Sequence, residues 1–159
     1  MWISGVIKFT EPTAEAIQFI ADNMRDADIV EVWAAGHHTP IDSLTKSIDI
    51  SEFNTLVTID DIPCVLFGLV RTDILSGSGV PWMLGATSIM KHKREILKHS
   101  PVVIEQMLTI CPNLVNYVHG KNKMSIRWLK WLGFIIEEPV PRGPDNELFH
   151  RFHRSLTDV

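Results

Sequence analysis

One stretch near the C-terminal end carries the strongest signal for the fold of this chain, and it is Asn122-Lys123-Met124-Ser125-Ile126-Arg127-Trp128-Leu129-Lys130-Trp131-Leu132-Gly133-Phe134. Asn122 is a residue type that caps helix N-termini, and Gly133 is the type that ends helices. Between them, apolar residues recur at the spacing of one helix face, at Ile126, Leu129 and Leu132. Apolar runs at residues 114–118 and 134–136 flank this helix, so the stretch predicts a strand–helix–strand unit.

The rest of the chain alternates between helical and strand patterns. Helical spacing predicts helices at residues 13–35, from about residue 41, and at residues 88–99 and 100–111. Ser100 as N-cap and Pro101 at the first helical position separate the last two. Apolar, β-branched runs predict strands at residues 3–9, 56–59, 63–70, 80–86 and 148–152, with Asp60-Asp61 as a hairpin turn. The resulting βαβ units indicate an α/β fold whose mixed, partly parallel, twisted sheet is flanked by helices on both faces.

Composition limits the classes of function. A chain of 159 residues, 45% of them hydrophobic, is able to bury the core of one domain, so we expect a single domain over residues 1–159. The formal net charge of -4 argues against nucleic acid as the main partner, because phosphate binding needs clustered Lys and Arg. Cys64 and Cys111 are isolated, and His150 and His153 would face opposite sides of a strand, so we expect no metal site. No apolar run spans a membrane and residues 1–5 lack a signal-peptide pattern, which predicts a cytoplasmic protein.

The segment 122–134 resembles the strand–Asn–helix–Gly–Phe segment of the GNAT N-acetyltransferase family, and the order of elements is similar to the GNAT fold over nearly the whole chain. The resemblance implies a GNAT-like fold that binds acetyl-CoA or another acyl-CoA and transfers the acyl group to an amine or protein acceptor. In that fold the acyl-CoA lies in a wedge where two parallel strands splay apart. Here those strands would be residues 80–86 and 114–118.

Three further segments resemble GNAT-like proteins of tailed phages, including the internal virion proteins of T7-like podophages. They are Met24-Arg25-Asp26-Ala27-Asp28 with Glu31, Trp82-Met83-Leu84-Gly85, and Asn116-Tyr117-Val118. This resemblance implies a bacteriophage protein that resides in the host cytosol or is packaged in the virion. Virion or host proteins are then possible partners.

The family resemblance implies a set of cofactor-binding residues: Leu84, Ala86, Lys91, Lys93, Arg94 and Asn122. Backbone N–H groups near Leu84 and Ala86 would polarise the thioester carbonyl. The pyrophosphate of the cofactor normally lies on a glycine-rich turn at a helix N-terminus. This chain has Gly85 alone in that region, followed by cations, so the pyrophosphate loop is degenerate and side chains would replace backbone donors.

The resemblance also implies the catalytic candidates. Many family members place a tyrosine on the Asn-capped helix as general acid, and this chain has Leu129 there. Its one tyrosine, Tyr117, lies on the preceding strand. Transfer to an amine also requires a base, and the candidates are Glu31, Asp28 and His119.

Each of these residue groups has a plain structural alternative. Arg25, Asp28 and Glu31 follow one another at i, i+3 spacing, which is typical of a surface ion-pair ladder. The cations of residues 91–94 are as typical of a solvated helix face as of a phosphate site. Asn122 is first a helix cap that would border the groove, and Trp128 is first a core or interface anchor.

Three functions therefore remain open: an acyl-CoA-dependent N-acyltransferase, a catalytically silent GNAT-like virion or assembly protein that binds other proteins, and a phage protein that acts on a host factor. The splayed strands distinguish the first two. An open groove between them favours cofactor binding, whereas a groove filled by Met83, Met90 or Trp128 favours a scaffold.

Overall fold

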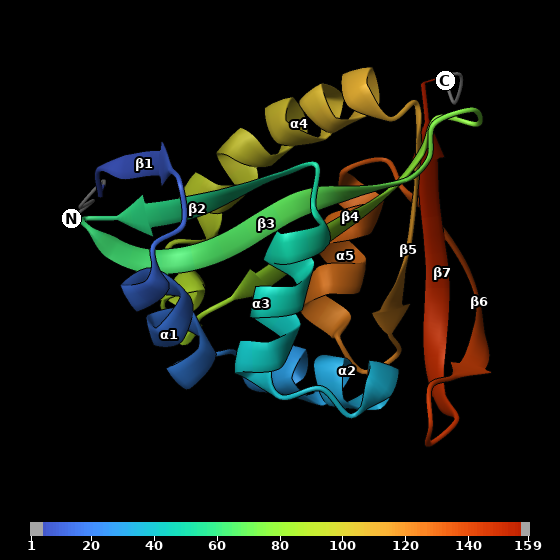
Figure 1. The fold of residues 1–159 in the computed structure, drawn as a ribbon, viewed down its shortest axis with the longest axis horizontal. Helices are drawn as coiled ribbons and strands as arrows, with labels where there is room; N and C mark the ends of the chain where they lie inside the picture. Colours follow the sequence, from blue (N-terminus) through green and yellow to red (C-terminus); the bar gives the residue numbers. More distant parts are fainter. Residues whose placement is uncertain (1–4, 157–159) are drawn as a thin grey trace.

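The computed structural model describes residues 5–156 and shows one continuous seven-stranded sheet in the order β1-β2-β3-β4-β5-β7-β6 (Figure 1). The strands are β1 (Ile7–Thr10), β2 (Phe53–Ile59), β3 (Ile62–Asp73), β4 (Ser78–Gly85), β5 (Asn113–His119), β6 (Ile135–Arg142) and β7 (Glu147–Ser155). The helices are α1 (Ala14–Asp22), α2 (Asp26–Gly36), α3 (Pro40–Ile50), α4 (Lys93–Ile110) and α5 (Lys123–Trp131). Every predicted strand is present, but the first one begins at Ile7, because Gly5 and Val6 are not part of a strand; residues 3 and 4 of the prediction lie outside the described residues.

The sheet is mixed, as predicted. Strands β1 to β4 are antiparallel neighbours, and so are β5 with β7 and β7 with β6. Asp60 and Asp61 both have positive φ, as the tight turn between β2 and β3 requires. The parallel pair is β4 with β5, joined by a crossover through α4.

Helices cover both faces of the sheet, which confirms the predicted layers. On one face, α1, α2 and α3 contribute buried residues such as Ile20, Val32 and Leu44 to a core that includes Leu66 and Leu84 of the sheet. On the other face, α4 and α5 contribute Ile104 and Trp128 to a second core. The sheet therefore separates two cores, and a gap between its strands connects the two sides. Within residues 5–156, no helix is long and apolar enough to cross a membrane.

The prediction of one helix over residues 13–35 is wrong, because the chain leaves the helix between α1 and α2. Met24 forms an antiparallel bridge with Ala86, and the N–H of Arg25 donates to the carbonyl of Gly85 at 3.0 Å. The N–H of Thr87 donates back to Asn23 O at 2.8 Å. These backbone bonds to the end of β4 replace helical bonds, and nothing in the local sequence signals them.

The predicted helix start at Ser100 is also wrong. Residues Thr87–Lys91 form a 3-10 turn, and α4 then runs without interruption from Lys93 to Ile110 with Pro101 inside it. The Ser100 hydroxyl donates to Ile96 O at 2.6 Å instead of capping a new helix. A proline in a helix interior costs about 3 kcal/mol, and burial of apolar side chains on both sides of it offsets that cost.

Candidate active site at the splayed strands

Strands β4 and β5 pair only where they begin. Ser78 lies opposite Asn113 and Gly79 opposite Leu114, and beyond this point the two strands form no further pair in the described part of the chain. In Figure 1 they start together near the tip of the β3–β4 hairpin and then diverge. The splayed strands that the sequence predicted are therefore present.

A cavity of about 350 Å³ occupies the gap between these strands. Its lining comes from both sides of the sheet: Asp28, Glu31, Ser43 and Ser47 from α2 and α3, and Ile96, Ser100, Trp128 and Leu129 from α4 and α5. Met83 and Trp128 line the cavity and leave it open, and Met90 does not belong to its lining. The cavity thus passes through the sheet, so that two ligands can approach one another from opposite faces.

The register of β4 determines which of its N–H groups face the gap. The N–H of Ala86 donates to Cys64 O of β3 at 2.8 Å, so Ala86 and, by alternation, Leu84 point their N–H groups at β3. Met83 and Gly85 therefore direct theirs at the gap. The N–H groups of Leu84 and Ala86, which were expected from the sequence to polarise the carbonyl, belong to the β3–β4 ladder. The sequence did not single out Met83 as an N–H donor to the gap.

Asn116 bridges the narrow end of the gap. Its Nδ2 donates to Pro81 O of β4 at 2.7 Å, and its Oδ1 accepts from the N–H of Tyr117 at 2.7 Å. Pro81 has no N–H to leave unpaired on the open edge. The Asn116 side chain thus extends the pairing of the two strands by one rung and sets where the opening begins.

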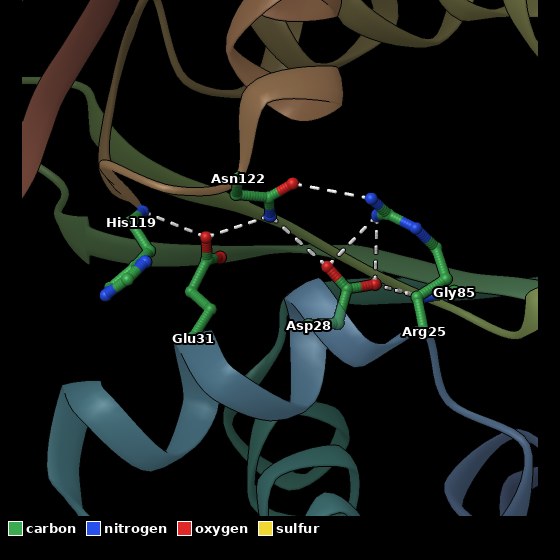
Figure 2. A network of polar contacts seen from close by, with 6 residues as sticks. All are labelled: Arg25, Asp28, Glu31, Gly85, His119 and Asn122. Carbon is green, nitrogen blue, oxygen red and sulfur yellow. Dashed lines mark hydrogen bonds and ion pairs between the residues drawn. The ribbon is translucent and has the colours of Figure 1, made fainter.

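A buried polar network closes the wide end of the gap (Figure 2). The Arg25 guanidinium lies 3.1 Å from Asp28 Oδ1, and Asp28 Oδ2 accepts from the N–H of Gly85 at 3.0 Å. Asn122 joins them, because its Oδ1 accepts from Arg25 and its Nδ2 donates to Asp28, both at 3.4 Å. Arg25, Asp28 and Asn122 are only 6%, 2% and 2% exposed.

The burial of this network overturns two plain alternatives. Arg25 and Asp28 form an interior ion pair that ties α2 to the end of β4, and not a surface ladder. Asn122 stands at the N-cap position of α5, but its side chain makes no capping bond and points into the network instead. Burial raises the pKa of Asp28, and the Arg25 guanidinium opposes that rise.

Glu31 lies one helical turn beyond Asp28 and reaches the cavity. Its Oε2 accepts from the N–H of His119 at 2.9 Å and from Asn122 Nδ2 at 3.0 Å, which leaves Oε1 for a ligand. Burial is the main cause that raises the pKa of Glu31 from 4.5 to about 7, against the lowering effect of these two hydrogen bonds. A carboxyl group with such a pKa exchanges protons readily at neutral pH.

The raised pKa predicts how stability depends on pH. Between pH 4.5 and about 7 the unfolded chain ionises Glu31 while the folded chain keeps its proton, so stability falls as pH rises through this window. Urea unfolding at pH 5 and pH 8 should show that the unsubstituted protein loses about 2 kcal/mol more of its unfolding free energy over this interval than Glu31→Gln does. Equal pH dependence of the two proteins would contradict the shifted pKa.

The other two catalytic candidates are placed differently. The ring of His119 points away from the network and its Nε2 lies 2.7 Å from Glu147 Oε1, so His119 contributes its backbone N–H to the site and not its ring. Tyr117 lines the cavity, and the guanidinium of Arg142 lies 3.5 Å from the centre of its ring. Leu129, at the position of the family tyrosine, lines the cavity as well.

The three cations proposed for the cofactor lie at the end of the 3-10 turn and at the start of α4. Lys91, Lys93 and Arg94 are all exposed, and none of them lines the cavity between the strands. Lys93 lines a neighbouring hollow of about 270 Å³ between α4 and α5, together with Arg127 and Trp131. Trp128 lines both spaces and lies between them. Arg127 is a second cation at this place that the sequence did not single out.

Solved structures share this architecture. Spermidine N-acetyltransferase from Vibrio cholerae, in complex with CoA and spermine, matches with a TM-score of 0.70 at 14% identity over 96% of each chain. The ribosomal-protein alpha-N-acetyltransferase RimL, in complex with CoA, matches with a TM-score of 0.68 at 7% identity over 96% of each chain. No protein-family model and no curated protein matches the sequence. Together with the splayed parallel strands, these likenesses show that the chain has the GNAT acetyltransferase fold.

Proposed function

We propose that the protein is an acyl-CoA-dependent N-acyltransferase that uses acetyl-CoA. The observation that carries the proposal is the cavity through the sheet, which both the Met83 N–H and the Glu31 carboxyl group face. Two structures of the same fold are complexes with CoA, which supports the choice of cofactor.

The residues around the gap fit such a cofactor. The indole N–H of Trp128 is buried and has no hydrogen-bond acceptor among the described residues, and a buried unsatisfied donor costs about 1–3 kcal/mol. An amide carbonyl of a pantetheine arm would supply an acceptor for it. Lys93 and Arg127, beside the first turn of α4, would face the phosphates.

The chemistry follows from the placement of these groups. Acetyl-CoA supplies an activated acetyl thioester, whose C–S bond breaks as a C–N bond to the acceptor amine forms. The Met83 N–H stabilises negative charge on the carbonyl oxygen, and Glu31 accepts the proton of the amine through Oε1. Tyr117 is the proposed donor of a proton to the leaving thiolate. Asp28 and Asn122 position Glu31 and the end of β4.

We further propose that the enzyme is phage-encoded and acts in the host cytosol. The similarity of residues 24–31, 82–85 and 116–118 to GNAT-like phage proteins supports this origin. Two observations support a degenerate pyrophosphate loop. Glycine is scarce after Gly85, and the N–H groups of Thr87 and Ile89 already donate to Asn23 O and Ala86 O.

A second candidate is a catalytically silent virion-associated protein of the same fold. Leu129 in place of the family tyrosine favours it, and so does the exposure of two tryptophans, Trp33 at 49% and Trp131 at 60%. Large exposed aromatic side chains are common anchors of protein interfaces. The two candidates differ in whether the protein turns over acetyl-CoA.

The test is CoA release from acetyl-CoA, followed with a thiol reagent, in the presence of primary amines that include amino acids, their amides, spermine and peptides. We expect amine-dependent release above the rate of thioester hydrolysis, with the acetylated amine confirmed by mass. Acetyl-CoA that neither binds nor is consumed with any acceptor would leave the silent protein as the better account.

Replacing Trp128 with Phe isolates one proposed contact with the cofactor. The change removes the unsatisfied N–H together with the five-membered ring of a core indole, so the protein without ligand should be somewhat less stable through lost packing. Binding of acetyl-CoA, measured by calorimetry, should weaken about fivefold through the loss of one hydrogen bond. Trp33→Phe, on the exposed face of α2, is the matched control, and equal affinity of both variants would argue against this contact.

A further inference from the structure

The charged side chains that line the cavity show what kind of acceptor fits it. Its lining contains two carboxyl groups, those of Asp28 and Glu31, one guanidinium, that of Arg142, and one imidazole, that of His99. Asp28 is paired with Arg25. Within residues 5–156, neither Glu31 nor Arg142 has an ion-pair partner, so one carboxyl group and one guanidinium face the same space without a counter-charge of their own.

Arg142 lies on the acceptor side of the sheet. It is the last residue of β6, opposite Glu147 of β7, and its guanidinium stacks on the ring of Tyr117. Val118 packs on the side of α4 and α5, so its neighbour Tyr117 faces the opposite side of the sheet, where α2 and Glu31 lie. Arg142 lies on that side too, because it covers the Tyr117 ring. A stacked guanidinium keeps its N–H donors in the plane of the group, free to bind a carboxylate with two parallel bonds.

The turn that follows Arg142 is fixed to the end of α2. Gly143 packs so closely that a Cβ atom there would lie 2.0 Å from Ala34 O, and its φ of 78° also favours glycine. Asp145 lies 2.9 Å from the ring Nε2 of His37. These contacts hold the β6–β7 turn against the helix that carries Glu31, so the two charges keep a defined separation.

We propose that the acceptor of the acyltransferase is an amine that also carries a carboxylate, as in a free amino acid, with the carboxylate on Arg142 and the amine at Glu31. This inference rests on the proposed function and deepens it. Two opposite charges in one cavity match a zwitterion and disfavour a polycation, because Arg142 repels a second ammonium group.

The experiment compares each of the standard L-amino acids with its carboxamide as acceptor at saturating acetyl-CoA. A carboxamide lowers the pKa of the neighbouring amine and thereby favours the amide in the chemical step, so a preference for the acid reports on binding. We expect at least one acid to exceed its amide at least tenfold in kcat/KM, mainly through KM, and spermine to be a poor acceptor. Arg142→Met should reduce this ratio about tenfold or more, and Arg142→Lys should restore part of it.

A binding measurement without acetyl-CoA supports the kinetic one. The preferred acid should raise the melting temperature of the unsubstituted protein and of Arg142→Lys, but not that of Arg142→Met. Transfer to amides or spermine at rates equal to the acids would overturn the acceptor assignment while the acyltransferase stands, and so would an unchanged ratio in Arg142→Met. Failure to bind acetyl-CoA and to acetylate any amine would overturn both the proposed function and the acceptor assignment.

Discussion

Replacing Glu31 with Gln should lower the rate of acetyl transfer by about 10²–10⁴-fold, the range typical of a lost general base. Glutamine keeps an oxygen for the hydrogen bonds from the His119 N–H and Asn122 Nδ2, but it has no basic site for the amine proton. The rate of the unsubstituted protein should rise with pH through an apparent pKa near 7 and then level off, since Glu31 must be ionised to act.

The pH profile separates this role from a structural one. In Glu31→Gln the remaining activity should lack the inflection near pH 7, while thermal unfolding at pH 5 should match the unsubstituted protein, because Glu31 is then protonated in the fold. Asp26→Asn, an exposed change in the first turn of the same helix, is the control. A Glu31→Gln variant that keeps both the rate and the inflection would show that another group takes the proton.

Replacing Asp28 with Ala should cost about 3–5 kcal/mol of unfolding free energy, the largest stability effect that we expect from a single change in the site. The substitution leaves the guanidinium of Arg25 buried without its carboxylate, and the N–H of Gly85 loses its acceptor. It also releases α2 from the end of β4, so acetyl transfer should fall even where the protein is folded.

Urea denaturation measures this cost, with Asp26→Ala as the matched control. Asp26 is exposed and lies near the same helix N-terminus, where its charge contributes only about 0.3–1 kcal/mol. The double variant Arg25→Met with Asp28→Leu should recover much of the loss, because it removes both charges instead of one. A loss for Asp28→Ala no greater than that of the control would mean that the buried pair does not hold α2 in place.

Most of the fold was predictable from local patterns. Alternating apolar runs located the strands, and Asp60-Asp61 located a turn whose two residues both have positive φ. The errors arose where long-range backbone bonds override local preference. The break before Arg25 exists because the chain pairs with Gly85 and Ala86, some 60 residues away, and α4 continues through Pro101 because burial outweighs the lost helical bond.

The candidate site was predictable in its residue types more than in its geometry. Helical spacing placed Arg25, Asp28 and Glu31 on one face, but the partner that buries them, Asn122, lies more than 90 residues away in sequence. The strand that carries the proposed oxyanion donor was also identified. Successive N–H groups of a strand point to opposite edges, so either Leu84 or Met83 directs its N–H at the gap. The hydrogen bond from the Ala86 N–H to Cys64 O decides that it is Met83.

The most direct test of acyl-CoA binding between the splayed strands is a titration of the ¹⁵N-labelled protein with acetyl-CoA, followed by the backbone amide signals of β4. We predict that the Met83 amide shifts strongly on binding and that Leu84 and Ala86, whose N–H groups are directed at β3, shift far less. Unchanged β4 amides at saturating acetyl-CoA would contradict the account, and so would shifts confined to residues outside the gap.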